Sequence, residues 1–309
     1  MTILVTGGLG YIGSRLIREL PFHPQYSGEE IRIIDNLRQP RYHVLWDLPV
    51  YANYDFVEGD IRDEDAVRQA MSGVNTVFHL AAVTNAPETF KIPEKTWEVN
   101  YEAAIGVFEA AREAGVQEFV NAVTCSVYGT TEEEIREGYE CDPESPYGEA
   151  KLEAEQQMFE RDDGEMGLTA LRLGTVYGWT SGMRFDTVVD KFAYLAATGT
   201  PLTVYEGAEE QKRPYLHVRD AVRSMLFAGA NLGDGEAYNV VGQNARLKDV
   251  VDVIQRHFPG VEIGYVEAKQ LNQLSYIVSD EKIRNKGFET VYTIDQGVRE
   301  LADKYRALL

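Results

Sequence analysis

The first twenty residues combine a short apolar strand, a glycine-rich turn and an amphipathic helix, and no other feature restricts the possible folds as strongly. Residues 3–6 form the strand, "TGGLGYIG" carries Gly7, Gly10 and Gly13, and a proline ends the helix predicted over residues 11–20. Glycine lets a backbone approach a pyrophosphate, and a helix N-terminus supplies N–H groups and partial positive charge. An ordinary tight turn shows the same pattern. The flanking strand and helix favour a dinucleotide site with Gly7, Gly10, Tyr11, Ile12 and Gly13.

Strand and helix patterns continue to alternate through the first half of the chain. Strands are predicted over residues 31–35, 74–80 and 118–123, and a helix over residues 103–114 that Gly115 ends. Such alternation predicts an α/β fold, a Rossmann-type doubly wound parallel sheet. After about residue 175 the pattern loosens into short mixed elements. We therefore expect an NAD-binding lobe over residues 1–175 and a smaller mixed lobe over residues 176–309, closely packed across a soft boundary.

Charge and cysteine content narrow the functional classes. The formal charge of −20 repels phosphate backbones and argues against nucleic-acid binding, although it does not separate a salty habitat from plain solubility. No apolar run approaches the roughly 18 residues of a membrane span, and no signal peptide is expected at the N-terminus. Two cysteines make no disulfide framework. These features predict a cytoplasmic protein, and no metal site is expected.

Acidic residues near the ends of two predicted strands indicate which dinucleotide the site would bind. Asp35 ends the second strand, where a carboxylate suits a ribose 2′-hydroxyl and repels a 2′-phosphate. Arg38 is the competing signal, because a nearby arginine can hold NADP. We favour NAD, since Asp35 stands at the strand tip. Asp60 and Ile61 follow another short strand and could contact the adenine ring, although Asp60 could cap a helix nearly as well.

A tyrosine and a lysine four residues apart supply the candidate catalytic base. Ser145 and Pro146 are typical of an N-cap and a first helical residue, so Tyr147 and Lys151 should share one face of a helix. A tyrosine pKa near 10 must fall by about three units to serve at pH 7, which takes about 4 kcal/mol. A lysine ammonium and a cationic nicotinamide ring close to the tyrosine would both lower its pKa. The spacing alone occurs by chance on many surface helices.

The motifs together resemble the extended short-chain dehydrogenases/reductases, in the NAD-dependent nucleotide-sugar epimerase/dehydratase branch and like UDP-glucose 4-epimerases. The matching segments are "TGGLGYIG", Asp35-Asn36-Leu37, Asp60-Ile61-Arg62, "FHLAA", Asn100, "TCSVYG", "SPYGEAK", "LRLGTVYG" and "RPYLHVRD". They run in the expected order through most of the chain. The resemblance implies a Rossmann lobe for NAD(P), a C-terminal lobe for a nucleoside diphosphate, and often a homodimer.

Roles carried over from the resemblance define the site. Tyr147 becomes the general base, Lys151 its electrostatic partner and holder of the nicotinamide ribose, and Thr124 the hydrogen-bond partner of the reacting hydroxyl. The implied cofactor-binding residues are Gly7, Gly10, Tyr11, Ile12, Gly13, Asp35, Asn36, Asp60, Ile61, Leu80, Ala81, Ala82, Asn100, Tyr147 and Lys151. The implied substrate-binding residues are Thr84, Ser126, Thr175 and Arg213.

Departures from the family pattern shape the expected chemistry. Dehydratases carry an Asp-Glu pair directly after the threonine, whereas this chain has Cys125 and Ser126. A dehydratase needs an acid and a base there. The family's 3,5-epimerases use a cysteine one position later, so we expect Cys125 to be a packed thiol. An asparagine that contacts the sugar diphosphate is replaced by Thr175, and the late Arg-Pro-Gly-Asp motif is missing, with Lys269 near its place.

The predicted function is therefore an NAD-dependent 4-epimerase that acts on a nucleoside-diphosphate hexose, hexuronate or pentose through a 4-keto intermediate. The nearest alternative is an NAD(P)H-dependent reductase of 4-keto sugar nucleotides, which uses the same residues. A non-catalytic NAD-sensing protein is a further alternative, although a sensor has no need of Thr124, Tyr147 and Lys151. We expect His217 to be a structural hydrogen-bonding residue.

Overall fold

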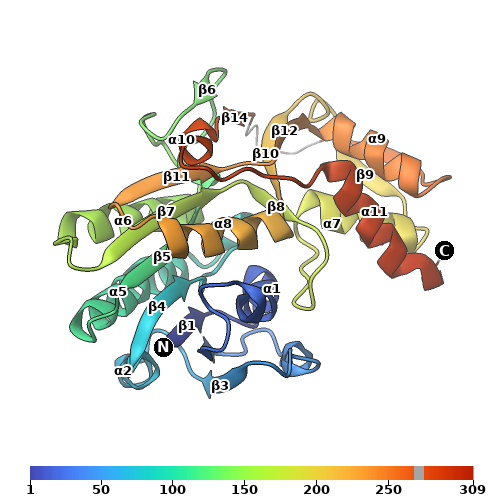
Figure 1. The fold of residues 1–309 in the computed structure, drawn as a ribbon. Coiled ribbons are helices and arrows are strands. Elements are labelled where there is room, and N and C mark those ends of the chain that lie inside the picture. The colour runs from blue at the N-terminus through green and yellow to red at the C-terminus, as the bar shows by residue number, and fades with distance from the viewer. Residues whose placement is uncertain (268–274, 309) are drawn as a thin grey trace.

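The computed structural model describes residues 1–267 and 275–308, which form a large parallel sheet with helices on both faces and a smaller lobe beside it (Figure 1). Seven strands make the sheet, in the order β11-β7-β5-β4-β1-β2-β3. Every pair of neighbouring strands in this sheet is parallel. The strands are β1 (Thr2–Thr6), β2 (Glu30–Asp35), β3 (Asn53–Glu58), β4 (Val74–His79), β5 (Glu118–Thr124), β7 (Gly167–Leu173) and β11 (Glu236–Val240). The predicted α/β fold is confirmed.

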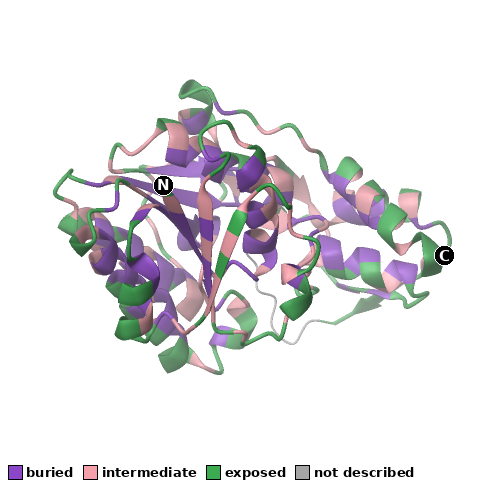
Figure 2. Ribbon diagram, turned by 60° about the horizontal axis from the view of Figure 1, so that its bottom comes forward, coloured by how far each residue is buried: buried purple, intermediate pink, exposed green. Residues whose placement is uncertain are grey.

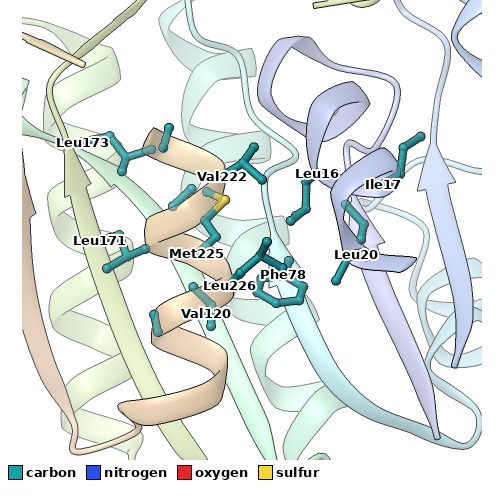
Figure 3. Close-up of a cluster of buried hydrophobic side chains, with 14 of the residues drawn as sticks. Leu16, Ile17, Leu20, Phe78, Val120, Leu171, Leu173, Val222, Met225 and Leu226 are labelled. Carbon is teal, nitrogen blue, oxygen red and sulfur yellow. The ribbon is translucent and has the colours of Figure 1, made fainter. Parts of the chain in front are cut away.

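Helices α1 and α8 cover one face of this sheet. Leu16, Ile17 and Leu20 from the α1 region and Val222, Met225 and Leu226 from α8 meet strand residues such as Phe78, Val120, Leu171 and Leu173 (Figure 3). Burying each such side chain contributes about 1.5–3 kcal/mol. Helices α2, α5 and α6 cover the other face. Figure 2 shows that the strands of the sheet are largely buried, whereas the helices around them have exposed outer surfaces. The helices of this lobe are α1 (Tyr11–Glu19), α2 (Glu64–Met71), α3 (Ala86–Thr89), α4 (Pro93–Trp97), α5 (Ala103–Glu113), α6 (Pro146–Arg161) and α8 (Val218–Asn231).

The smaller lobe holds short strands and three packed helices. One sheet has the order β12-β10-β8, and β13 pairs with β9. Helices α7, α9 and α11 share an apolar core with these strands. The elements are β8 (Thr175–Tyr177), α7 (Val188–Ala197), β9 (Leu202–Tyr205), β10 (Lys212–His217), β12 (Gln243–Arg246), α9 (Leu247–His257), β13 (Ile263–Val266) and α11 (Ile294–Tyr305). The short helix α10 (Glu281–Asn285) instead packs beside β11, and its Ile283 joins the core of the large sheet. A separate pair joins β6 (Glu134–Ile135) and β14 (Ile277–Val278). Short 3-10 or π turns are η1 (Leu20–Phe22), η2 (Tyr42–Leu45), η3 (Glu98–Glu102), η4 (Cys125–Val127) and η5 (Arg306–Leu308).

The chain after residue 175 contributes to both lobes. Strand β11 pairs in parallel with β7 at the edge of the large sheet, and α8 packs on that sheet. The predicted division near residue 175 stays a prediction, and the two lobes interleave along the chain. No helix within residues 1–267 and 275–308 is long and apolar enough to cross a membrane.

Candidate active site

A cleft of about 730 Å³ opens at the carboxyl ends of the parallel strands. Its walls come from the glycine-rich turn, the end of β2, the segment after β4, the ends of β5 and β7, the start of α6 and residues 183–187. In open α/β sheets, ligands bind at this end of the strands. The volume and the position fit a cofactor and a substrate together.

The glycine-rich turn is so closely packed that side chains would not fit. Gly7 has φ +68°, and a Cβ there would lie 2.8 Å from the Ala81 backbone. A Cβ on Gly13 would lie 2.4 Å from the Gly7 oxygen. No side chain caps α1 at Gly10, so the first N–H groups of this helix are available to a ligand. Gly7, Gly10, Tyr11, Ile12 and Gly13 all line the cleft.

Asp35 lies on the cleft wall at the tip of β2. Its carboxylate accepts hydrogen bonds from the backbone N–H groups of Leu9 (3.0 Å) and Leu37 (2.9 Å), which fix its orientation. Burial raises the pKa of this carboxyl, and the two N–H groups oppose that rise. Asn36 and Arg38 also line the cleft, and Arg38 forms an exposed ion pair with Glu88 at 3.3 Å.

Two predicted cofactor residues, Asp60 and Asn100, are not among the described residues that line the cleft. The Asp60 carboxylate is bound by Arg62 and Asn36, and the Arg62 guanidinium holds the pKa of Asp60 well below its usual range. Ile61 and Arg62 reach the cleft. Asn100 is fully buried, and its amide exchanges two hydrogen bonds with the backbone of Val83 (2.7 and 2.9 Å). Asn100 therefore supports the segment after β4, from which Leu80, Ala81 and Ala82 line the cleft.

Tyr147 stands in the first turn of α6, close to Thr124 and Ser126. Ser145 caps the helix by accepting from the Gly148 N–H at 3.2 Å. A Cβ on Gly148 would lie 3.0 Å from the Ser126 oxygen, so the helix starts directly against η4. Thr124 Oγ1 accepts from the Ser126 N–H and lies 3.1 Å from Ser126 Oγ. Burial raises the pKa of Tyr147, while the charge of Arg184 and a hydrogen bond with Thr124 oppose that rise.

Lys151 lies one helical turn after Tyr147, and its buried amine also lines the cleft. Burial lowers the pKa of Lys151 to about 8, against the opposing charge of Glu155. Glu155 is in turn held by Arg172, whose Nε lies 3.0 Å from Oε2. The sequence interpretation expected Tyr147 to be driven toward tyrosinate. The protein groups alone leave its pKa above the ordinary value, because burial outweighs the favourable charges.

Of the predicted substrate residues, Thr84, Ser126 and Thr175 line the cleft. Arg213 is not among the described lining residues. It lies half-buried on β10, opposite Ala245 of β12. Lys269, the other candidate cation, lies outside the described residues.

Arg184 and Tyr276 are two polar cleft residues that the sequence predictions did not include. Arg184 donates to Thr84 Oγ1 at 3.1 Å and forms a two-point ion pair with Asp186 (2.5 and 2.7 Å). Tyr276 is buried, lines the cleft and hydrogen-bonds Ser126. Both come from irregular segments far along the chain, so no spacing signal points to them.

Cys125 and His217 are packed side chains. The Cys125 thiol is 1% exposed and donates to the Arg172 oxygen at 3.2 Å, and burial raises its pKa. His217 accepts from the Arg219 N–H at 3.2 Å and stacks on Tyr292. Across the described ranges, no group of three or more His, Cys, Asp or Glu side chains is arranged to hold a metal ion.

Comparisons with known proteins agree with this geometry. Residues 3–241 match the model of the NAD dependent epimerase/dehydratase family. The UDP-glucose 4-epimerase of Streptomyces lividans is 30% identical over 283 residues, which is 82% of this chain and 80% of that protein. A trifunctional UDP-glucose 4,6-dehydratase/UDP-4-keto-6-deoxy-D-glucose 3,5-epimerase/UDP-4-keto-L-rhamnose-reductase of Arabidopsis thaliana is 27% identical over 98% of this chain, which spans 46% of its length. The crystal structure of the Thermus thermophilus UDP-glucose 4-epimerase in complex with NAD has a TM-score of 0.87 at 26% identity, with 100% of both chains covered.

Proposed function

The chain belongs to the NAD-dependent epimerase/dehydratase family, and from this premise we propose that it is a 4-epimerase of nucleoside-diphosphate sugars. Its cofactor is NAD, which when bound would supply reversible hydride transfer to and from the sugar. The residues fit this group, because the glycine-rich turn lines the cleft at the uncapped start of α1 and the Asp35 carboxylate stands at the strand tip. The first N–H groups of α1 would hold the pyrophosphate, and Lys151 the nicotinamide ribose.

Tyr147 is the residue that moves the proton in this proposal. Its phenolic oxygen takes the proton of the C4 hydroxyl, and Thr124 orients that hydroxyl. Burial keeps Tyr147 protonated in the protein alone, so its ionisation depends on positive charge brought close to it. Arg184 supplies part of that charge. We propose that Lys151, one helical turn away, and the bound nicotinamide would supply the rest. The resulting 4-keto sugar turns in the cleft and is reduced on its other face.

The proposal rests on one observation, that no unpaired carboxylate lies beside Thr124 among the described residues of the cleft. On the described cleft wall the carboxylates are Asp35, Glu88 and Asp186. Asp35 accepts two backbone hydrogen bonds, Glu88 pairs with Arg38, and Asp186 pairs with Arg184. The positions after Thr124 hold a buried thiol and a hydroxyl that bonds Tyr276. Removing a C5 proton and expelling a hydroxyl requires an acid and a base, so the site favours hydride chemistry at C4.

A panel of sugar nucleotides tests the proposal. Each sugar nucleotide is incubated with purified enzyme and no added cofactor. If the protein is a 4-epimerase, one pair of 4-epimers is interconverted. Product that forms only when NADH or NADPH is added would instead show the reductase. In D₂O the product should carry no carbon-bound deuterium, because the migrating hydride never exchanges with solvent. Deuterium at C3 or C5 would exclude the 4-epimerase and indicate proton abstraction beside the ketone.

A homodimer in the cytoplasm belongs to the same proposal. The family resemblance supports the dimer, and the two cysteines, Cys125 and Cys141, which are both free thiols, suit a reducing compartment. Light scattering of the purified protein should give twice the 34.8 kDa chain mass.

A further inference from the structure

The segment between β8 and α7, residues 178–187, reaches away from its own lobe toward α1 (Figure 1). At its start, the Tyr11 hydroxyl lies 2.6 Å from the Gly178 oxygen and 2.7 Å from Asp190 of α7. Ser14 Oγ lies 2.6 Å from Thr180 Oγ1. Tyr11 and Ser14 belong to the helix that follows the glycine-rich turn. The segment is therefore fastened to the helix that begins the cofactor site.

Further contacts fasten the segment along its length. His43 Nε2 lies 2.9 Å from the Ser181 oxygen, and Arg41 donates to the Met183 oxygen at 3.0 Å. At the far end Arg184 donates to Thr84 Oγ1 at 3.1 Å. These partners follow β2 and β4. The segment thus runs across the carboxyl ends of the strands that form the predicted cofactor site.

Gly182 shows how closely the segment lies on the glycine-rich turn. A Cβ at this position would lie 2.5 Å from the Gly10 oxygen and 2.7 Å from Ser14 Oγ, and the Gly182 N–H donates to Ser14 Oγ at 3.0 Å. Real Cβ atoms do not approach so closely, so a side chain would push the segment away. Ser14 and Gly182 do not themselves line the cleft, whereas residues 183–187 do.

We propose that residues 178–187 are a strap that closes over bound NAD and retains it through many catalytic turnovers. The glycine-rich turn and residues 183–187 both line the cleft, and the contacts above join the segment to the helix after that turn, so a dinucleotide bound there would leave only after these contacts break. An epimerase restores its NAD in every cycle and needs no exchange, whereas a reductase must release it. This inference rests on the proposed 4-epimerase function and explains how one NAD molecule would serve it.

The test measures NAD exchange in two variants that loosen the strap without touching the cleft wall. Ser14→Ala removes the oxygen that binds both Thr180 and Gly182, and Gly182→Ala introduces the clash with Gly10. Gly138→Ala is the matched control, because a Cβ there meets nothing within 4 Å. Each protein is purified with its NAD, incubated with radiolabelled NAD, and sampled by gel filtration over hours.

We expect the parent and Gly138→Ala to exchange NAD over hours. Ser14→Ala, which loses both hydrogen bonds to the strap, should exchange at least about tenfold faster. Gly182→Ala should exchange faster still, and both variants should keep the parent kcat at saturating NAD. Exchange rates equal to that of the parent in both variants, or a parent that exchanges within one turnover, would overturn the strap. A parent that retains NAD and still converts no sugar nucleotide would overturn the 4-epimerase and leave the strap standing.

Discussion

Replacing Lys151 by methionine should stabilise the folded protein at pH 7 while it abolishes turnover. The Lys151 side chain is 3% exposed, and burial lowers its pKa from 10.5 to about 8. Each unit of this pKa difference corresponds to about 1.4 kcal/mol of folding free energy. Below pH 8, where Lys151 is charged in both states, its burial therefore lowers the stability of the folded protein by about 3 kcal/mol. Methionine fills similar space without that charge. Glu155 keeps Arg172 as its partner, so the change leaves no unpaired buried charge there.

The sign of the pH dependence gives the sharper test. Between pH 8 and 10.5 the unfolded chain binds the Lys151 proton more tightly than the folded protein, so the parent gains stability as the pH rises. The methionine variant lacks this gain. Its advantage should therefore be largest below pH 8 and disappear near pH 10.5.

Urea unfolding of cofactor-free protein at several pH values from 7 to 10.5 measures this advantage. Lys191→Met on α7, where the side chain is exposed, is the matched control and should change stability little at any pH. A Lys151→Met protein that is less stable than the parent at pH 7 would refute the reasoning. A stability difference that stays constant with pH would refute it equally.

Three more outcomes are expected. Cys125→Ala should keep most of the turnover and lose about 1–2 kcal/mol in urea unfolding, because the thiol is packed; abolished turnover would make it a proton donor. Tyr147→Phe should lose several orders of magnitude in kcat yet co-purify with NAD, since only the phenolic oxygen is removed; activity within tenfold of the parent would contradict the assigned base. NAD should bind at least tenfold more tightly than NADP in competitive titration, because the Asp35 carboxylate repels a 2′-phosphate by more than about 1.4 kcal/mol. Tighter binding of NADP would show that Arg38, and not Asp35, determines the cofactor preference.

The sequence predicted the parts of the site that local rules control. Ser145 and Pro146 mark the start of a helix by capping chemistry, and the structure places Tyr147 and Lys151 one turn apart on that helix, both on the cleft wall. Asp35 stands at a strand end that apolar residues define. Each of these signals lies within a few residues of the feature it predicts.

Contacts between distant segments explain what the sequence did not predict. Arg184 meets Thr84 across 100 residues, and Tyr276 meets Ser126 from a segment near the end of the chain. No periodicity or capping rule connects such pairs, because their proximity is a product of the whole fold. Asn100 illustrates the converse, since a residue in a matching motif lies fully buried and supports the cleft from behind.

The return of β11 to the large sheet affects how the protein can be made. Strand β7 remains an open edge, and Leu171 and Leu173 lack their α8 cover, until residues 218–240 have left the ribosome. Open strand edges and exposed apolar faces promote aggregation. A nascent or truncated chain that ends near residue 175 would carry both hazards at once. The cofactor lobe thus depends on the second half of the chain for its solubility as well as for the walls of its cleft.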